Sequence, residues 1–437
     1  MKNLWQWELV IESLIDNQCR QSLLACERIY VGYSGGLDST VLLHALSQDP
    51  NFLPKITAVH INHGLSPNAQ GWEKHCQAFC KKLNLPLIIR AINLHKQGNV
   101  EEIARKARYE VFRDLVQEND CLLLAHHLND QAETLLLHLF RGAGIDGLAA
   151  MPFCKSFAKG KLIRPLLFHS RATLNNYAGE MQLDWVEDES NENSDFSRNF
   201  IRHQIIPELR SRWPKVINNL TRTSEHCQQA QSNLDDLAKM DCPSLNDIST
   251  VLELNQLKKL NRARLTNVLR LWLKKNEVRL PSTATFTRLI TELIEAASDA
   301  NPQVSWPDIS VRRYQNALYL IKKANPPLPL ITPWPTFPEP LNLPGLGELK
   351  VKAAKKGLAI PAGSKIEIRF RQGGETLTWR KQTKELKKLF QQWQVPTWLR
   401  NRIPLLYINE QLACVVGYAI SDSFFKDSQE SFEIALL

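Results

Sequence analysis

The residues best suited to chemistry lie in a short glycine-containing segment, 34–40, with the sequence SGGLDST. The adjacent glycines Gly35 and Gly36 permit a tight turn in which successive backbone N–H groups face an anion. Serine and threonine hydroxyl groups add donors, and the segment lacks the lysine of loops that transfer a γ-phosphate. The segment therefore predicts a phosphate-binding loop made by Ser34, Gly35, Gly36, Leu37, Asp38 and Ser39.

Asp38 is unusual beside a phosphate, because two negative charges repel each other unless a cation lies between them. Mg²⁺ accepts both carboxylate and phosphate oxygens, so we predict that Asp38 holds Mg²⁺. The structural alternative is that Asp38 only complements the positive end of the following helix. Six suitable residues in a row at a strand–helix junction favour the phosphate-binding interpretation.

A second chemistry-bearing segment, 126–134, has the sequence HHLNDQAET. His126, Asp130 and Glu133 follow a buried strand and open a helix, where two carboxylates and an imidazole could hold Mg²⁺ and an amino group. Asp130 and Glu133 also fit a helix-capping box, which needs no chemistry. His126 and Asp130 have a spacing that suits metal ligands, but no third ligand follows convincingly, so we do not expect zinc.

The elements that must position these segments read as alternating strands and helices. Apolar runs of strand length occupy 28–33, 56–61, 87–92 and 121–125, and amphipathic stretches with helical spacing lie between them. Repeated β-α units with continuously apolar strands predict an α/β fold with a doubly wound parallel sheet. Such sheets bind ligands at the carboxyl ends of strands, near the topological switch point.

The chain's 437 residues suggest further domains. We predict a catalytic domain over 1–215, a helical domain with a basic exposed side over 216–325, a proline-rich connector over 326–345, and a small α+β domain over 346–437. In the last domain we expect strands at 366–370, 405–408 and 412–418, and a basic helix near 384–393.

Charge and composition narrow the class of protein. The net charge is +9, yet residues 1–210 carry −2 and the remainder +11, which suggests chemistry in the first half and polyanion binding in the second. Apolar runs stay shorter than the ~18–20 residues of a membrane helix, and no signal-peptide pattern opens the chain. Nine scattered cysteines without a CxxC pair predict reduced thiols in a cytoplasmic protein.

The motifs also carry a resemblance to known proteins. SGGLDS resembles the PP-loop of N-type ATP pyrophosphatases, which split ATP into AMP and PPi. The segment HHLNDQAET, continuing to RGAGIDGL at 141–148, closely resembles that of the tRNA(Ile)-lysidine synthase family. Three more stretches are similar to that family: VHINHGL at 59–65, EIARKARY at 102–109 with Arg105 and Arg108, and DESN at 188–191 followed by RNFIR at 198–202.

The resemblance extends along nearly the whole chain, and it implies a reaction. ATP would adenylate the C2 oxygen of cytidine 34 in a tRNA(Ile) with a CAU anticodon and release PPi. The ε-amine of L-lysine would then attack C2 and expel AMP. The resemblance implies that Asp38 and Asp130 bind Mg²⁺, and that Glu133, together with Asp130, orients the lysine amine. Arg105, Arg108 and Arg198 then contact phosphate, lysine or RNA, and His126 belongs to the catalytic set.

Stretches at 267–273, 299–319 and 369–407 are similar to the tRNA-binding domains of longer family members. They imply tRNA contacts by Arg270, Arg312, Arg313, Arg371, Lys387 and Lys388. A PP-loop tRNA thiolase, an amidotransferase-type ligase and a non-catalytic RNA-binding protein are the alternatives. The thiolase would normally need paired reactive cysteines, and the ligase would need an ammonia source. A non-catalytic RNA-binding protein would have no reason to keep the GGLD turn. The oligomeric state is left open, a homodimer included.

Overall fold

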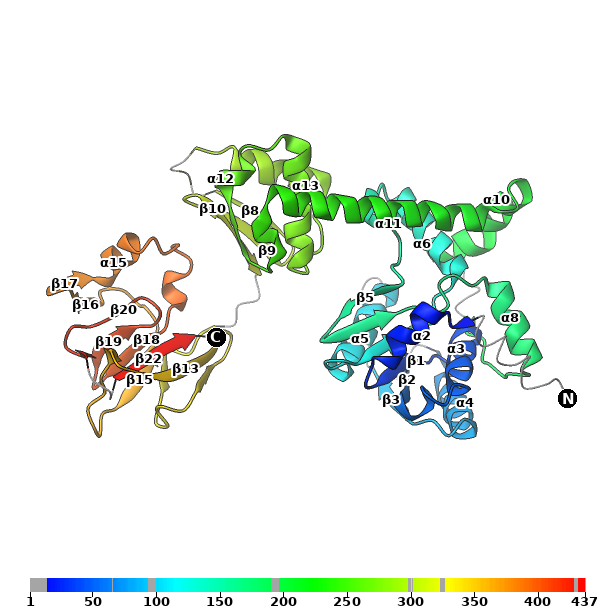
Figure 1. The fold of residues 1–437 in the computed structure, drawn as a ribbon, viewed down its shortest axis with the longest axis horizontal. Coiled ribbons are helices and arrows are strands. Elements are labelled where there is room, and N and C mark those ends of the chain that lie inside the picture. The colour runs from blue at the N-terminus through cyan, green and yellow to red at the C-terminus, as the bar shows by residue number, and fades with distance from the viewer. Residues whose placement is uncertain are drawn as a thin grey trace. The chain divides into compact units, whose positions relative to one another are not determined.

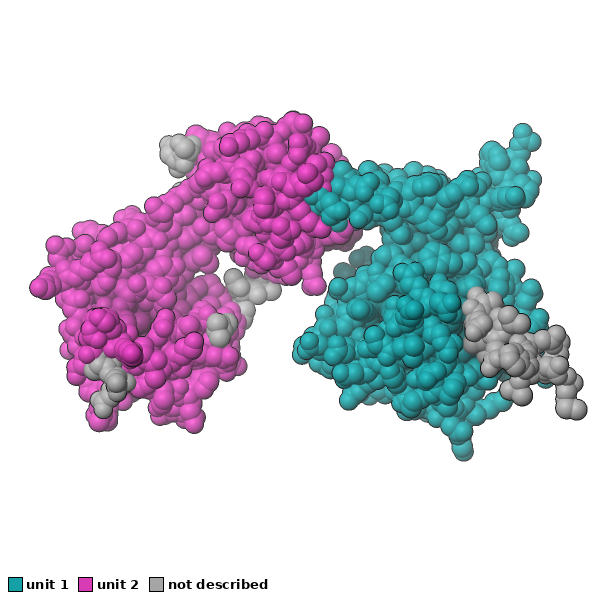
Figure 2. Space-filling view, in the orientation of Figure 1, with its two compact units in different colours: residues 1–236 teal, residues 237–437 magenta. Residues whose placement is uncertain are grey.

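The computed structural model describes residues 14–64, 66–92, 100–189, 196–297, 300, 302–322, 327–427 and 431–436. Ser190 and Asn191 of the DESN stretch, and Asp299 and Asn301 of the second tRNA-binding stretch, therefore lie outside the described residues. The chain divides into two compact units, 1–236 and 237–437 (Figure 2). The domain boundaries drawn from the sequence stay predictions. Among the described helices, none combines the length and apolar character that crossing a membrane requires.

A six-stranded sheet forms the centre of the first unit, in the order β3-β2-β1-β4-β6-β5. All neighbouring strands run parallel except β5, which is antiparallel to β6. The strands are β1 (Ile29–Gly32), β2 (Ile56–Asn62), β3 (Leu87–Ala91), β4 (Cys121–Leu123), β5 (Cys154–Phe157) and β6 (Gly160–Ile163). The first four lie where the apolar runs predicted them, and the predicted α/β fold with a parallel sheet is confirmed.

Helices cover both faces of this sheet (Figure 1). Helices α2, α3, α4 and α8 pack on one face around Val41 and Phe79, and α5 packs on the other through Phe112. The helices of the first unit are α2 (Asn17–Leu24), α3 (Leu37–Ser47), η1 (Leu53–Lys55), α4 (Ala69–Lys82), α5 (Val100–Leu115), α6 (Leu128–Phe140), α7 (Ile145–Leu148), α8 (Arg171–Glu180), α9 (Ser197–Phe200), η3 (Ile201–Ile205), α10 (Ile206–Arg212) and α11 (Val216–Asp241).

The strand order creates a switch point between β1 and β4. From β1 the chain moves outward through β2 and β3, and it then returns to place β4 on the other side of β1. The connections that leave the carboxyl ends of β1 and β4 therefore diverge, which opens a crevice at that edge of the sheet. The predicted phosphate loop follows β1, and the segment that begins at His126 follows β4.

The first part of the second unit contains a sheet that the sequence did not predict. Four antiparallel strands in the order β7-β10-β9-β8 share a core with the helices around Trp272. This part was expected to be helical, and its strands were missed because they are short and carry charged residues. The elements are β7 (Val251–Glu253), β8 (Gln303–Trp306), β9 (Ile309–Tyr314), β10 (Ala317–Lys322), η4 (Pro243–Asn246), α12 (Leu254–Leu257), α13 (Arg262–Lys275), α14 (Thr283–Arg288) and η5 (Leu289–Ile294).

The last part combines two five-stranded sheets with a hairpin and short helices. The expected basic helix is α15, and three strands form where the sequence placed them, as β15, β18 and β19. The elements are β11 (Ile331–Pro333), β12 (Leu341–Leu343), β13 (Gly347–Ala354), β14 (Gly357–Leu358), β15 (Ile366–Arg369), β16 (Thr376–Trp379), β17 (Gln382–Glu385), α15 (Leu386–Gln392), η6 (Arg400–Arg402), β18 (Leu405–Ile408), β19 (Gln411–Val415), β20 (Ala419–Ile420), β21 (Phe425–Lys426) and β22 (Ser431–Leu436).

The proline-rich stretch differs from the semi-rigid connector that its composition suggested. It contributes β11 and β12, each at the edge of its sheet, and Trp334 between them is buried in the core. Edge strands tolerate proline because only one side of the strand must supply hydrogen bonds to a neighbour. The described part of this stretch thus belongs to the folded C-terminal part.

Candidate functional site

The loop after β1 has the backbone of an anion-binding turn. Gly35 adopts a positive φ of 86°, and Gly36 occupies the N-cap of α3, where it offers no side chain to cap the first amides. Ser39 Oγ donates to Gly36 O at 3.0 Å and lies 3.0 Å from Ser34 Oγ, which ties the ends of the turn together. The first amides of a helix lack partners within the helix, so the start of α3 suits a phosphate group.

Asp38 lies in the first turn of α3 and faces the loop that follows β4. Its Oδ2 is 3.6 Å from Nε2 of His127, and its Oδ1 is buried with no hydrogen-bond partner among the described residues. Burial raises the pKa of the Asp38 carboxyl, and the Asp130 carboxylate adds to this rise while His127 opposes it. A buried carboxylate oxygen without a donor is costly on its own and suits a bound cation.

His127 and Asp130 cap the start of α6. His127 N donates to Asp130 Oδ2 at 3.0 Å, and Asp130 N donates to His127 Nδ1 at 3.3 Å. This reciprocal pair replaces the Asp130–Glu133 capping box that the sequence also allowed. Nδ1 of His127 takes part in this cap, so Nε2 is the ring nitrogen that faces Asp38.

Two acids and two arginines form the most buried charged group of the site. Arg198 donates to Asp130 Oδ1 at 2.9 Å and to Glu133 Oε2 at 2.8 Å. Arg202 donates to Asp130 Oδ1 at 3.2 Å and to Glu133 Oε1 at 2.7 Å. Glu133 is only 1% exposed. Burial opposes ionisation of Asp130, but His127 and Arg198 outweigh it and lower the pKa of Asp130 below its usual value.

Asp130, Glu133 and Arg198 were predicted as site residues, and the structure brings them together. Arg202 and His127 were not in that predicted set. Two signals pointed to them: Arg202 follows Arg198 by four residues, which places both on one helix face, and His127 is the second histidine of the HH pair.

His126 is held beside this group by Arg164, which sequence reasoning also missed. Arg164 Nε donates to His126 Nδ1 at 3.2 Å, so the ring keeps its proton on Nε2. Burial and the nearby arginines lower the pKa of His126 to about 3, and the imidazole is therefore neutral at pH 7. Burial first, and then the positive charge of Arg108 among others, lowers the pKa of both His126 and His63. Arg105 is exposed and lies over the Tyr109 ring at 5.1 Å.

The predicted tRNA-binding residues of the second unit fall into different environments. Lys387 and Lys388 are exposed on α15, and Arg312 lies over the Trp398 ring at 5.1 Å. Arg270 donates to Asn267 on its own helix, and Arg371 donates to Asn401.

Arg313 must be reassigned from RNA contact to a structural role. It is 1% exposed, and its NH1 donates to Leu293 O and Ala296 O at the end of η5. Successive strand residues point to opposite faces, so Arg312 and Arg313 of β9 cannot share one environment.

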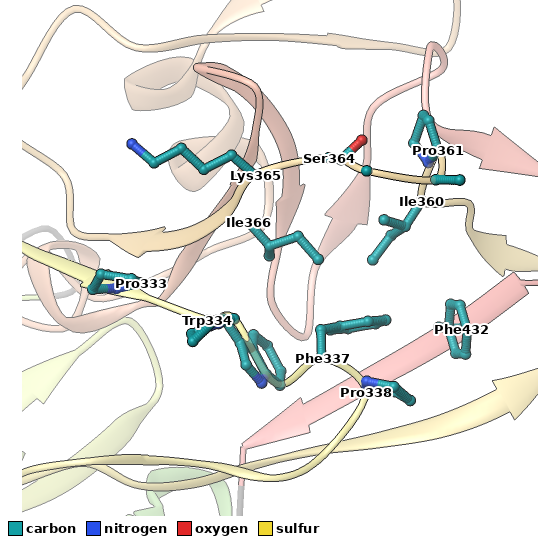
Figure 3. Close-up of a pocket in the computed structure, with 13 residues that line it drawn as sticks. Pro333, Trp334, Phe337, Pro338, Ile360, Pro361, Ser364, Lys365, Ile366 and Phe432 are labelled. Carbon is teal, nitrogen blue, oxygen red and sulfur yellow. The ribbon is translucent and has the colours of Figure 1, made fainter.

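A cavity of about 630 Å³ lies in the C-terminal part (Figure 3). Trp334, Phe337 and Phe432 contribute aromatic rings to it, and Lys365 is the charged residue in its lining. Ser364 also lines it, and most of the other lining residues are apolar.

Comparisons with known proteins match three successive parts of this chain to domains of one family. Residues 9–209 match a PP-loop domain, 252–319 match a TilS substrate binding domain, and 366–435 match a TilS substrate C-terminal domain. The tRNA(Ile)-lysidine synthase of Legionella pneumophila strain Lens is 53% identical over 91% of this chain and 93% of that protein. The chain belongs to the tRNA(Ile)-lysidine synthase family. The Coxiella burnetii synthase is 44% identical over 92% of this chain and 91% of its own length.

Among solved structures, a U34-tRNA thiolase from Methanococcus maripaludis is 16% identical and covers 51% of this chain and 78% of its own, with a TM-score of 0.42. The family assignment confirms the resemblance seen in the sequence motifs. It also connects the PP-loop with ATP use and the second unit with a tRNA substrate.

We expect Gly35→Ala to weaken ATP binding about tenfold. Its φ costs an alanine about 1–2 kcal/mol, and the new Cβ would lie 3.0 Å from Cys76 Sγ and Val186 Cγ2. Isothermal titration with ATP measures the effect. Gly71→Ala, where the added Cβ meets nothing within 4 Å, is the matched control. Unchanged ATP affinity in Gly35→Ala would contradict the loop assignment.

We expect Arg313→Met to lower the free energy of unfolding of the second unit by about 3 kcal/mol, because it leaves buried carbonyl groups without donors. Arg312→Met, one residue earlier and partly exposed, should change it by less than about 1 kcal/mol. Urea unfolding of both variants distinguishes them, and equal destabilisation would be inconsistent with the assigned roles.

Proposed function

We propose that this chain ligates L-lysine to C2 of cytidine 34 in the CAU anticodon of tRNA(Ile), converting ATP to AMP and PPi. The observation that carries the proposal is the convergence of the PP-loop and the Asp130–Glu133–Arg198–Arg202 group on one switch point. Family membership supports the tRNA substrate. A cytoplasmic location is part of the proposal.

The ATP phosphates bind the loop Ser34–Ser39 through backbone amides and hydroxyl groups, as the turn and the helix start favour. Asp38 would hold Mg²⁺ through its unpartnered Oδ1, with Asp130 nearby. The described residues contain no group of three or more acids, histidines or cysteines arranged to hold a metal alone. That fits Mg²⁺, which commonly uses one or two carboxylates and takes further ligands from phosphates and water.

The chemistry explains why ATP is required. The C2 carbonyl of a pyrimidine is a poor electrophile, and adenylation of its oxygen creates a good leaving group. The lysine amine, whose free pKa is ~10.4, must lose a proton before it attacks C2. Asp130, which remains ionised because of its low pKa, is the carboxylate that we propose orients this amine.

Glu133 takes a different part from the one its sequence suggested. Both of its carboxylate oxygens accept hydrogen bonds from the charged side chains of Arg198 and Arg202. Asp130 accepts from the arginines through Oδ1, and its Oδ2 accepts from the backbone N–H of His127, which leaves a lone pair of Oδ2 for an amine. We assign Glu133 as a positioning residue that fixes the two guanidinium groups. These groups, with Arg108, then stabilise phosphate charge as AMP forms and leaves.

The basic second unit binds the tRNA through phosphates, with exposed Lys387 and Lys388 among its contacts. The target base lies in a single-stranded loop and can be splayed into the crevice. A tRNA thiolase is less well supported, because the sequence has no CxxC pair and the second unit matches TilS substrate domains. A homodimer stays a prediction, which sedimentation of the purified chain measures.

The direct test incubates the chain with ATP, labelled lysine and a CAU-anticodon tRNA(Ile) transcript. We expect label in the RNA and release of AMP and PPi in equal amounts. Incorporation of sulfur from a sulfur donor, with no lysine incorporated, would favour the thiolase instead.

Asp38→Ala should abolish PPi release and leave tRNA affinity nearly unchanged, because the variant removes the carboxylate proposed for Mg²⁺ and no RNA contact. A PPi-release assay and a filter-binding assay measure the two properties. Asp114→Ala, at an exposed aspartate of α5, is the matched control. Full turnover by Asp38→Ala would refute the metal role.

Replacing Lys387 and Lys388 together by alanine should weaken tRNA binding severalfold and reduce its salt dependence, while ATP affinity stays the same, since each phosphate contact releases counterions. Alanines at Lys81 and Lys82, an exposed pair at the end of α4, provide the control. Equal losses in the two double variants would argue against a tRNA-binding role for α15.

A further inference from the structure

A groove of about 370 Å³ lies on the helices that carry the charged group, at the far end of α6. Its volume is in the range of small-ligand pockets, about 300–1,000 Å³. It is formed by the last turns of α6 together with α9 and η3. The residues that line it are Leu137, Phe140, Arg141, Ser197, Phe200, Ile201 and Ile205.

Two phenylalanines of this groove are unusually open to solvent. Phe140 is 65% exposed and Phe200 is 46% exposed, and Leu139 and Phe196 beside them are exposed as well. The hydrophobic core of these helices does not need them, because it is built from other residues such as Leu136 and Ile201. A contiguous exposed apolar patch marks a binding surface more often than a structural one.

The groove is joined to the catalytic group through one short helical segment. Ser197 and Phe200 line the groove, whereas Arg198 and Arg202 of the same segment hold Asp130 and Glu133. The segment continues into a π-helical turn, Ile201–Ile205. Such turns are rare in proteins, and those that occur often lie at functional sites. A molecule in the groove would therefore contact the same helical segment as the charged group, with Phe140 about 15 Å along α6 from Asp130.

The charge around the groove selects the class of ligand. Arg141 lines it, and the exposed Arg210 and Arg212 on the adjoining α10 carry further positive charge. Aromatic faces beside arginine are the surface on which unpaired nucleobases stack, with the arginine near the phosphate. An apolar peptide would need no such arginines.

We infer that this groove binds an unpaired base of the anticodon loop next to the target cytidine, through stacking on Phe140 and Phe200. The inference rests on the proposed function, since it takes the substrate to be a tRNA anticodon. Holding the neighbouring base prevents it from stacking back on the cytidine, and so keeps the cytidine splayed toward Asp130 and Asp38.

The test measures base stacking and ligation separately, in the full-length chain. Two tRNA transcripts are labelled: one has 2-aminopurine in place of the adenine that follows the cytidine, and the other has a fluorescent pyrimidine in place of the base that precedes it. Fluorescence on binding is recorded without ATP or lysine, so that it does not depend on ligation. Lysine incorporation is measured with unlabelled transcript.

We expect quenching of at least one label by the unchanged chain, and loss of that quenching in Phe140→Ala/Phe200→Ala. In the same variant kcat/KM for tRNA should fall about tenfold, as removal of a base-stacking ring does elsewhere, while KM for ATP stays constant. The single variant Phe200→Trp, which keeps an aromatic ring at this position, should retain both the quenching and the kcat/KM of the unchanged chain. Leu24→Ala, at a 44% exposed position of α2, should change neither.

Quenching that persists in the double variant, or quenching of neither label, would overturn the inference. A loss of ligation without a change in fluorescence would overturn it too, since the groove would then act other than by stacking. If the unchanged chain quenches a label but incorporates no lysine, the proposed function fails while base binding stands.

Discussion

The buried pairing of Asp130 and Glu133 with Arg198 and Arg202 is the interaction on which the site depends. Two acids are buried here against two arginine side chains that stay 26% and 21% exposed, and the desolvation of the acids is offset only when each has well-placed partners. Removing one partner of such a buried pair typically costs about 3–5 kcal/mol. The pairing therefore fixes the segment after residue 196 against α6, although the paired residues are 65 to 72 positions apart in sequence.

Helix geometry explains why the two acids of α6 can each pair with both arginines. Residues three or four apart lie on one face of a helix, separated by about 4.5–6 Å along its axis. Asp130 and Glu133 are three apart on α6, and Arg198 and Arg202 are four apart, so two acids meet two guanidinium groups in register. The reciprocal cap between His127 and Asp130 then fixes the first turn of α6, and with it the imidazole that faces Asp38.

Much of the first unit could be predicted because its signals are local. Apolar runs specified β1 to β4, and the SGGLDS turn specified a glycine loop whose strain only glycine relieves at residue 35. Pairings between distant segments could not be predicted in the same way. Nothing in the sequence near Glu133 shows that its oxygens are taken by Arg198 and Arg202, and so its proposed role had to change. In the second unit, β9 puts Arg312 and Arg313 in different environments, a distinction that depends on recognising a strand where a helix was expected.

Helix α6 and the segment formed by α9 and η3 together present a buried charged surface at one end and an exposed aromatic surface at the other. Toward the start of α6, the acids and arginines bury charge; toward its end, Phe140 and Phe200 expose aromatic rings. An aromatic ring left in water gains nothing for folding, whereas the charged group already holds α6 and α9 in place. The segment can therefore keep its rings exposed without losing its position. The exposed end adjoins a basic stretch and the buried end adjoins the PP-loop, so these helical segments would link the proposed base binding to the proposed chemistry at the switch point.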